Sequence, residues 1–425
     1  MKLTIIGLNY MPEPTGIAVY TAGLAEGLAS RGSDVLAIVG YPHYPQWKVY
    51  SGFTGRSCTH VEKEVTVHRV HQFVPAEPRL ANRMLMELDF GMKALVARWH
   101  RPDAVLFVSP ALFSVAIGMV RAKIMRTPAC IWVQDIYSLG VSESGTGGQL
   151  AGKVLRFVER AVLSSADSVI VIHERFRRYL LEDLGISADR IEVVRNWSHV
   201  DTTPHSIRSD VRAAHGWVDE DIIVLHAGNM GAKQGLENVV KASLVASSTR
   251  SKARFVLLGD GNQRAMLEAM GGNDRLEILD PLVENEFIAT LLAADILLVN
   301  ERPGLTEMSV PSKLTSYFSS GLPVIAATDA SSVTAQEIEL SGGGLRVDPD
   351  SPEALVAAAE RLAADPDFSR ACGAAGRRFS ARSLSPGLAI ESFEQILARL
   401  CGVSAPGGDY AATDTARNST GIGAT

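Results

Sequence analysis

Short apolar runs rich in β-branched residues alternate along the chain with longer segments whose apolar residues recur every three or four positions. The runs predict β-strands, and the longer segments predict amphipathic helices. Between the first two runs, for example, Tyr20–Arg31 carries Leu24 and Leu28 at helical spacing and stops at Gly32. This alternation is typical of βαβ units and parallel sheets. The expected strands are Lys2–Gly7, Val35–Val39, Ala104–Val108, Cys130–Val133, Ser168–Ile172 and Ile191–Val194, followed by Ile222–Ala227, Ala253–Leu258, Leu276–Leu279, Ile296–Val299, Val324–Ala326 and Gly344–Val347.

The polar, proline-containing segment Asn196–Ser206 interrupts this alternation. Because a chain of 425 residues exceeds the usual size of a single core, we place a domain boundary there. We predict an α/β fold with two Rossmann-like domains, residues 1–200 and 201–380, and a C-terminal helix within 381–403 that returns to the first domain. Residues 404–425 have scarcely an apolar side chain larger than alanine, which predicts a mobile tail.

The composition, 46% hydrophobic and 21% charged, indicates a soluble globular protein. The most apolar stretch, Pro110–Val120, is much shorter than the roughly 20 residues that cross a bilayer. The amino-terminal segment fits a first strand better than a signal peptide, so we expect a cytoplasmic location. The cysteines have no CxxC spacing, which favours buried free thiols over a zinc site or disulfides; they are Cys58, Cys130, Cys372 and Cys401.

Charge is divided unevenly, with a net +4 over residues 1–200 and −10 over the remainder. The segment Arg79–Arg101 mixes Leu, Met, Phe and Trp with basic residues. Such a segment is typical of an interfacial helix on an anionic membrane, and it is equally compatible with a packed amphipathic helix. The first half is therefore the better candidate for a surface that meets anions, although ordinary solvated faces explain the small excess as well.

A Pro/Gly loop, Asn9–Gly16, connects the first strand to a helix. Backbone N–H groups at such a junction can hold an anion or a sugar hydroxyl, and a plain structural turn fits equally well. The loop lacks GxGxxG, which argues against a nicotinamide dehydrogenase.

Two glycine-rich turns follow strands of the second half. His226–Leu236 contains Gly228, Gly231 and Gly235, and its Lys233 offers positive charge to a diphosphate. Leu258–Gly261 makes a second tight turn, for which a plain connection is the alternative. The carboxyl edge of an open parallel sheet is where ligands bind, so both turns are candidate donor-binding elements.

The block Glu307–Ala326 places Pro311 and Ser312 before a predicted helix, with Lys313 in its first turn. The helix N-terminus and Lys313 are expected to face the space between the domains and to form a second anion-binding helix end.

This block resembles the PSKL…Y…G-x-PV segment of retaining GT-B glycosyltransferases of family 4, group 1. The GNMGxKQGL, LGDG and strand–PxPxG–helix segments occur in that family's order, and the resemblance covers residues 1–400. In addition, Tyr41–Phe53 resembles the PxYPxW segment of the colanic-acid-type branch, which contains fucosyl and N-acetylfucosaminyl transferases of surface polysaccharide assembly.

The resemblance implies a GT-B fold and retaining transfer of a sugar from a UDP- or GDP-sugar to a glycan or polyprenyl-linked acceptor, at the inner face of the membrane. It implies no metal or other cofactor, and we expect no nucleic-acid partner. Many relatives have Arg, Lys and Glu where this chain has Asn229, Gln234 and Ser316, so the diphosphate charge is expected to rest on lysines and helix dipoles.

We expect three catalytic residues: Asp135, Lys313 and Lys233. For Asp135, a helix cap or loop carboxylate is the alternative. The expected donor-binding residues are Gly228, Asn229, Gly231, Gln234, Gly259, Gly261, Pro311, Ser312 and Ser316. The expected acceptor-binding residues are Gly16, His43, Tyr44 and Trp47, although Trp47 also fits a core anchor. His173 is a further candidate at the edge of the cleft.

Two other functions share these features. A GT-B-like sugar-nucleotide epimerase would use the same fold without an acceptor. A catalytically degenerate scaffold subunit is suggested by Asn229, Gln234 and Ser316.

Overall fold

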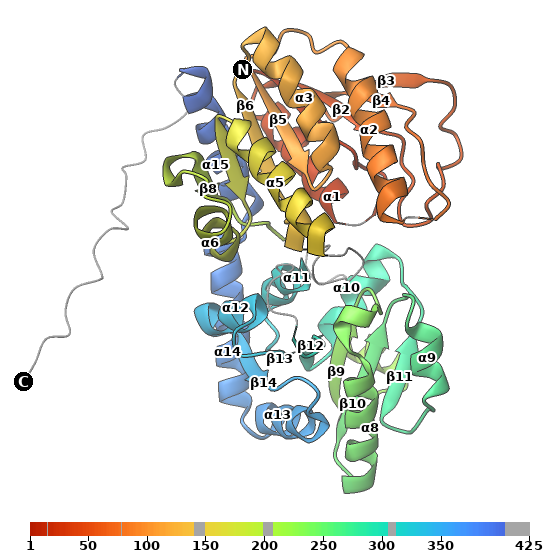
Figure 1. Ribbon diagram of the computed structural model, residues 1–425. Helices are drawn as coiled ribbons and strands as arrows, with labels where there is room; N and C mark the ends of the chain where they lie inside the picture. The colour runs from red at the N-terminus through yellow and green to blue at the C-terminus, as the bar shows by residue number, and fades with distance from the viewer. Residues whose placement is uncertain (15, 78, 140–148, 199–206, 305–311, 404–425) are drawn as a thin grey trace, which may run out of the picture.

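The computed structural model describes the chain except residues 15, 78, 140–148, 199–206, 305–311 and 404–425. Two α/β domains lie one above the other (Figure 1). The structure thus confirms the predicted fold class, while the predicted tail and most of the predicted linker lie outside the described residues.

The first domain is built on an eight-stranded sheet of order β3-β4-β2-β1-β5-β6-β7-β8. Every strand pair in it is parallel except β3 with β4. The strands are β1 (Lys2–Gly7), β2 (Asp34–Gly40), β3 (Ser57–Glu62), β4 (Val65–Val70), β5 (Ala104–Ser109), β6 (Ala129–Val133), β7 (Ser168–Val171) and β8 (Ile191–Val193). The β3–β4 hairpin was not among the expected strands. β3 is mostly exposed and polar, and β4 alternates buried valines with the half-buried Thr66 and His68, so neither strand is an uninterrupted apolar run.

Helices cover both faces of this sheet (Figure 1). They are α1 (Ile17–Ser30), α2 (Leu80–Val96), α3 (Leu112–Met125), α5 (Gln149–Ser165), α6 (Glu174–Glu182) and the short 3₁₀ helix η1 (Ala188–Arg190). Helix α1 starts three residues before the predicted Tyr20, directly after Gly16, which has a positive φ of 57°.

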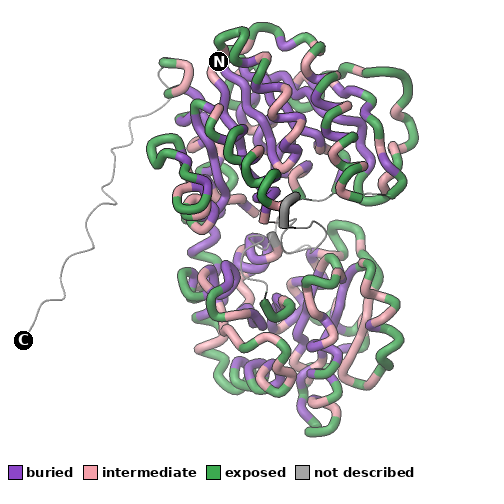
Figure 2. The backbone as a smooth tube through the Cα atoms, in the orientation of Figure 1, coloured by how far each residue is buried: buried purple, intermediate pink, exposed green. Residues whose placement is uncertain are grey.

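The second domain has a six-stranded, fully parallel sheet of order β11-β10-β9-β12-β13-β14. Its strands are β9 (Ile222–Ala227), β10 (Ala253–Leu258), β11 (Leu276–Leu279), β12 (Ile296–Asn300), β13 (Val324–Ala327) and β14 (Gly344–Val347). Its helices are α7 (Arg208–Ala214), η2 (Ala232–Gln234), α8 (Glu237–Thr249), α9 (Arg264–Ala269), α10 (Glu284–Ala293), α11 (Ser312–Ser320), α12 (Val333–Ser341), α13 (Pro352–Ala364) and α14 (Pro366–Ser383). Apolar clusters fill both faces of the sheet, and the buried backbone runs through the middle of each domain (Figure 2).

The last helix, α15 (Pro386–Cys401), packs against the first domain. Its Phe393 is fully buried in the core of that domain, with its ring 4.8 Å from the ring of Trp132. Trp197, which follows β8, stacks on the same Trp132 with ring centroids 6.0 Å apart. Chain segments on both sides of the second domain are therefore anchored in the first. Within the described residues, no helix is long and apolar enough to cross a membrane.

Candidate active site

A pocket of about 270 Å³ opens at the carboxyl edge of the first sheet. Its lining includes five residues expected from the sequence to line the site: Gly16, His43, Tyr44, Trp47 and Asp135. They come from three loops that follow β1, β2 and β6, and parallel strands bring the ends of those loops to one edge. Helix α2 forms the opposite wall with Arg83, Met86 and Glu87.

The loop that carries the aromatic residues is held by Glu13, a carboxylate that is only 1% exposed. One carboxylate oxygen of Glu13 accepts hydrogen bonds from the backbone N–H groups of His43 at 2.8 Å and Tyr44 at 2.9 Å. The other accepts a hydrogen bond from the side-chain amide of Asn9 at 2.9 Å. A buried carboxylate needs such donors, so Glu13 fixes this loop to the first turn after β1.

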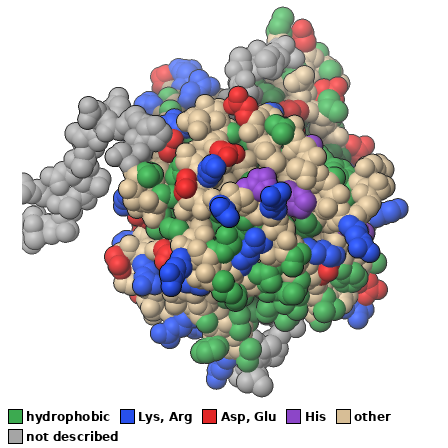
Figure 3. Space-filling model, turned by 90° about the horizontal axis from the view of Figure 1, so that it is seen from above, with side chains coloured by type: hydrophobic (Ala, Val, Ile, Leu, Met, Phe, Trp, Pro, Cys, Tyr) green, Lys and Arg blue, Asp and Glu red, His purple; other side chains and the backbone are tan. Residues whose placement is uncertain are grey.

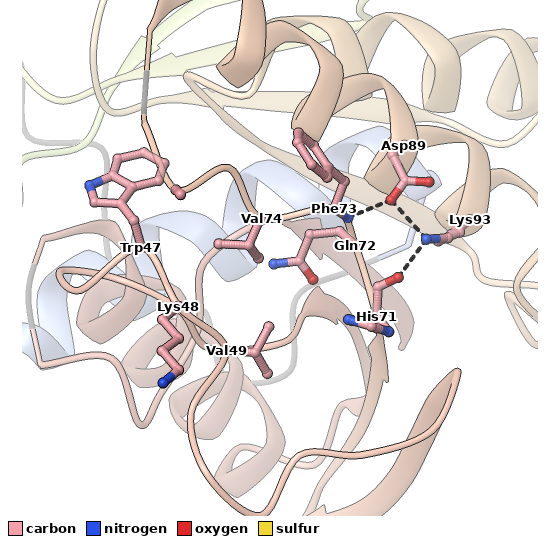
Figure 4. A pocket seen from close by; sticks show the side chains of 10 residues that line it. Trp47, Lys48, Val49, His71, Gln72, Phe73, Val74, Asp89 and Lys93 are labelled. Atoms are coloured by element: carbon pink, nitrogen blue, oxygen red, sulfur yellow. Dashed lines mark hydrogen bonds and ion pairs between the residues drawn. The ribbon is translucent and has the colours of Figure 1, made fainter.

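Trp47 separates the pocket from a second, more open hollow of about 580 Å³. Figure 4 shows this outer hollow, in which the carboxylate of Asp89 accepts hydrogen bonds from Phe73 N–H at 2.6 Å and from Lys93 at 2.7 Å. The Trp47 ring lies 5.8 Å from the His43 ring, and the Arg83 guanidinium lies 5.9 Å from its centroid. Trp47 also touches the core, so the platform and anchor interpretations both fit its position.

Two carboxyl groups in the inner pocket have raised pKa values. Burial raises the pKa of Asp135 to about 6, against the opposing charges of Lys233 and Arg83. Burial raises the pKa of Glu87 to about 7, although the group accepts a 3.1 Å hydrogen bond from Phe113 N–H. Glu87 was not among the expected site residues; its signal is an acidic residue on the apolar side of an amphipathic helix.

Lys233 belongs to the second domain, so its effect on Asp135 acts across the interface between the domains. The residue before Asp135 is also tied to the chain that joins the domains. Gln134 and Asn196 exchange side-chain amide hydrogen bonds of 3.2 and 2.8 Å.

In the second domain, the two glycine-rich turns interlock. Backbone hydrogen bonds join Gly228 N–H to the carbonyl of Leu258 and Met230 N–H to that of Asp260, each at 2.8 Å. A Cβ at Gly259 would lie 2.1 Å from the Gly228 carbonyl oxygen, and one at Gly261 would lie 2.5 Å from that of Met230. Close contact between the turns therefore requires glycine at 259 and 261, whatever the turns bind.

Lys313, in the first turn of α11, lies behind the first glycine turn. A Cβ at Gly228 would be 3.0 Å from its Cε atom. The ammonium nitrogen is 2.8 Å from Nε2 of His226, whose Nδ1 faces the Leu298 carbonyl at 3.2 Å. Burial lowers the pKa of His226 well below its usual range, with a further contribution from Lys313. The neutral ring therefore accepts a hydrogen bond from Lys313 at Nε2 and donates one from Nδ1 to the Leu298 carbonyl. Burial also lowers the pKa of Lys313 to about 7, against the opposing charge of Glu301.

The other expected donor-binding residues differ in their surroundings. The Gln234 side chain turns back to accept a 3.1 Å hydrogen bond from Gly231 N–H, and the Asn229 side chain fills the space beside Gly231 and Gly261. Ser316 is buried on α11. Pro311 and the side chain of Ser312 lie outside the described residues.

His173 is engaged elsewhere. Its Nε2 lies 3.0 Å from the Glu337 carboxylate of α12, and Arg195 donates to the same oxygen at 2.6 Å. Both His173 and Glu337 are 2% exposed, so this cluster joins the two domains beside the point where the chain crosses. Its geometry assigns His173 to the domain interface.

Within the described residues, no group of three or more His, Cys, Asp or Glu side chains is arranged to hold a metal ion.

Two Rossmann-like domains, each with candidate site residues at the carboxyl edge of its sheet, have the architecture of the GT-B fold. Residues 15–197 match the family model of the glycosyl transferase 4-like domain, and residues 207–379 match that of the glycosyl transferases group 1. The chain belongs to this glycosyltransferase family. It is 32% identical over 374 residues to the putative colanic acid biosynthesis glycosyl transferase WcaI of Escherichia coli K12, a match that covers 84% of this chain and 91% of the relative.

Solved structures share the fold. Sucrose-phosphate synthase from Thermosynechococcus elongatus superposes with a TM-score of 0.72 at 19% identity, over 95% of this chain and 100% of the other. HepE from Anabaena, in complex with UDP, gives 0.71 at 14% identity, over 94% of this chain and 100% of the other.

Proposed function

We propose that this glycosyltransferase moves a sugar from a UDP- or GDP-sugar, with retention at the anomeric carbon, to a lipid-linked glycan in surface polysaccharide assembly at the cytoplasmic face of the membrane. The relative named for colanic acid biosynthesis supports the pathway class. The HepE structures that hold UDP and UDP-glucose support a nucleotide-sugar donor.

The observation that carries the proposal is that Asp135, in the inner pocket of the first domain, lies close enough to Lys233 of the second domain for the lysine charge to lower its pKa. Asp135 lies in a sugar-sized pocket beside an aromatic side chain, Trp47, which suits an acceptor. Lys233 belongs to the glycine-rich turn that adjoins Lys313, which suits a diphosphate. The acceptor hydroxyl and the anomeric carbon would then meet between them.

In the proposed reaction, the bond between the anomeric carbon and the diphosphate oxygen breaks while the acceptor oxygen bonds to the same face of that carbon. The acceptor proton passes to the leaving phosphate oxygen. Negative charge grows on the diphosphate, so fixed positive charge there lowers the barrier. We assign this role to Lys313, Lys233 and the Gly228–Gly231 backbone, with Asp135 orienting the acceptor hydroxyl.

The test is the release of nucleoside diphosphate from a panel of UDP- and GDP-sugars, with and without a lipid-linked acceptor extract. If sugar is transferred, the release of nucleoside diphosphate depends on the acceptor, and label from the donor sugar appears in the lipid fraction. Retention requires that the anomeric configuration of the new linkage is the same as that of the donor. A chelator such as EDTA should leave the rate unchanged. An isomerised donor released without acceptor would instead identify an epimerase.

A further inference from the structure

Helices α2, α3 and α5 lie side by side over one face of the first sheet and form the outer layer of that domain (Figure 1). Gly91 of α2 lets this layer close up, since a Cβ there would lie 2.9 Å from the Cα of Ser114 in α3. We call the outward side of these three helices the outer helical face.

Large apolar side chains project from this outer helical face into solvent. On α2 they recur at three- and four-residue spacing, which places them in one stripe. The exposed set, between 38 and 79% accessible, is Leu85, Leu88, Met92 and Val96 of α2, Val120, Ile124 and Met125 of α3, and Val154 and Phe157 of α5. Figure 3, which looks down on the molecule, shows hydrophobic side chains gathered on one side among Lys and Arg. Isolated exposed apolar residues are ordinary, but a contiguous set marks an interaction surface.

The exposed charges within these helices have one sign. The three acidic residues they contain are not exposed: Glu87 and Glu159 are buried, and Asp89 is paired with Lys93 at 2.7 Å. The exposed basic residues within these helices are Arg83, Lys123, Lys153, Arg156 and Arg160. Beyond the helix ends the exposed charges are mixed, with Arg79, Arg98, Arg101 and Arg126 alongside Glu77 and Asp103. Lys123 and Arg156 have acidic neighbours in Asp167 and Asp183, at 3.6 and 3.1 Å, and both pairs are half-exposed.

We propose that the outer helical face docks on the surface of an anionic phospholipid bilayer. Apolar side chains that reach into the acyl boundary, surrounded by basic side chains at headgroup level, are the chemistry of interfacial binding. A protein partner of ordinary composition would have to bury basic side chains that outnumber the acidic side chains beside them, Asp167 and Asp183. The inference rests on the proposed lipid-linked acceptor in one respect: α2 also forms a wall of the inner pocket through Arg83, so docking would bring that pocket close to a lipid-borne glycan.

The test uses the full chain and vesicles of phosphatidylcholine alone or with about 30% phosphatidylglycerol, without donor or acceptor. Sedimentation should show binding at least about tenfold stronger to the anionic vesicles, weakened by high salt. The triple variant Val96→Glu, Ile124→Glu, Phe157→Glu should lose this binding. The matched variant Val283→Glu, Leu244→Glu, Leu340→Glu, which alters exposed apolar residues of the second domain, should keep it.

Thermal unfolding and sedimentation velocity accompany both variants. The proposal is overturned if the wild type does not bind anionic vesicles more strongly than neutral ones, or if both triple variants lose binding equally. It is also overturned if the only effect of the first triple variant is to dissociate a self-associated form of the protein. Transfer to a water-soluble acceptor should be the same in both variants. Loss of vesicle binding with that transfer intact separates docking from catalysis.

Discussion

His226 and Lys313 form a buried pair in which one partner is neutral and the other holds its proton weakly. An ammonium group with a pKa of about 7 is half deprotonated in the free protein near neutral pH. A diphosphate beside it stabilises the charged form and raises that pKa, so nucleotide binding should take up a proton.

The affinity for the nucleoside diphosphate should therefore fall as the pH rises above about 7, by at most about tenfold per pH unit. Calorimetry in buffers of different ionisation enthalpy measures both the affinity and the proton uptake. In Lys313→Ala the nucleotide affinity should not change with pH over this range. Turnover should fall, with a loss of roughly 2–4 kcal/mol of transition-state stabilisation. If the nucleotide affinity depends on pH equally in the wild type and in the variant, the charge on Lys313 does not contribute to nucleotide binding.

Gly228 offers a second test at this scale. Its φ of 123° and the nearby Lys313 side chain both oppose a larger residue. Gly228→Ala should displace Lys313 and reduce nucleotide affinity beyond its effect on folding. Gly216→Ala is the control, because Gly216 also has a positive φ, 66°, but open space around its Cα. Urea unfolding gives the folding cost of each variant, which should be larger for Gly228→Ala because a φ of 123° suits only glycine. Isothermal titration of the folded variants then measures the nucleotide affinity, and equal affinities would contradict this role.

At the scale of elements, α15 stabilises a domain from which it is separated in sequence by the whole second domain. Phe393→Ala should lower the free energy of unfolding by about 3–5 kcal/mol, because it empties a fully buried aromatic site against Trp132. Leu388→Ala, on the same helix but 48% exposed, should have little effect. Denaturant unfolding measures both, and similar losses would show that α15 acts through something other than this contact.

The sequence predicted elements whose signal is local. Every expected strand is present within one residue at each end, because buried parallel strands are short apolar runs. It also selected Gly16, His43, Tyr44 and Trp47 as acceptor-binding and Asp135 as catalytic. These five residues line one pocket, and their individual roles stay predictions.

Other features depend on partners that are distant along the chain. The Glu13 carboxylate meets a loop some 30 residues later, and His173 meets Glu337 at a separation of 164 residues. No local pattern marks such pairs. The position of Glu87 on the apolar side of its helix indicates burial, but it does not show that the carboxyl group lines a pocket.

For the whole molecule, the cluster of His173, Arg195 and Glu337 holds the domains together. Burial alone would raise the pKa of Glu337, but the hydrogen bond with His173 and the charge of Arg195 outweigh it and hold the pKa below its usual range. Stability from this group is therefore present above the unfolded value of 4.5 and is lost as the pH falls through the folded pKa.

Glu337→Gln should flatten this acid limb of the stability curve. It should also cost up to about 3 kcal/mol near neutral pH, because Arg195 loses its buried partner. Urea unfolding between about pH 3.5 and 7 measures both effects. A variant that keeps the acid dependence of the wild type would assign that dependence to other carboxylates.

We also expect donor binding to draw the domains together, because Asp135 and Lys233 come from opposite sides of the proposed reaction site. Small-angle scattering should give a smaller radius of gyration with saturating UDP- or GDP-sugar than without. Lys313→Ala at the same concentration is the control. An unchanged radius at saturation would mean that the described arrangement is already closed.

The chain passes between the domains twice, once after Trp197 and once between α14 and α15, and the two passages are joined by a 3.1 Å hydrogen bond from Ser198 N–H to the Leu384 carbonyl. A single chain connection would let one domain rotate freely against the other. Two connections that are joined beside each other allow the domains to bend about them and oppose twisting of one domain against the other. We therefore expect the domains to open and close mainly by bending about these two connections, so that each closure returns the same two walls to the same register.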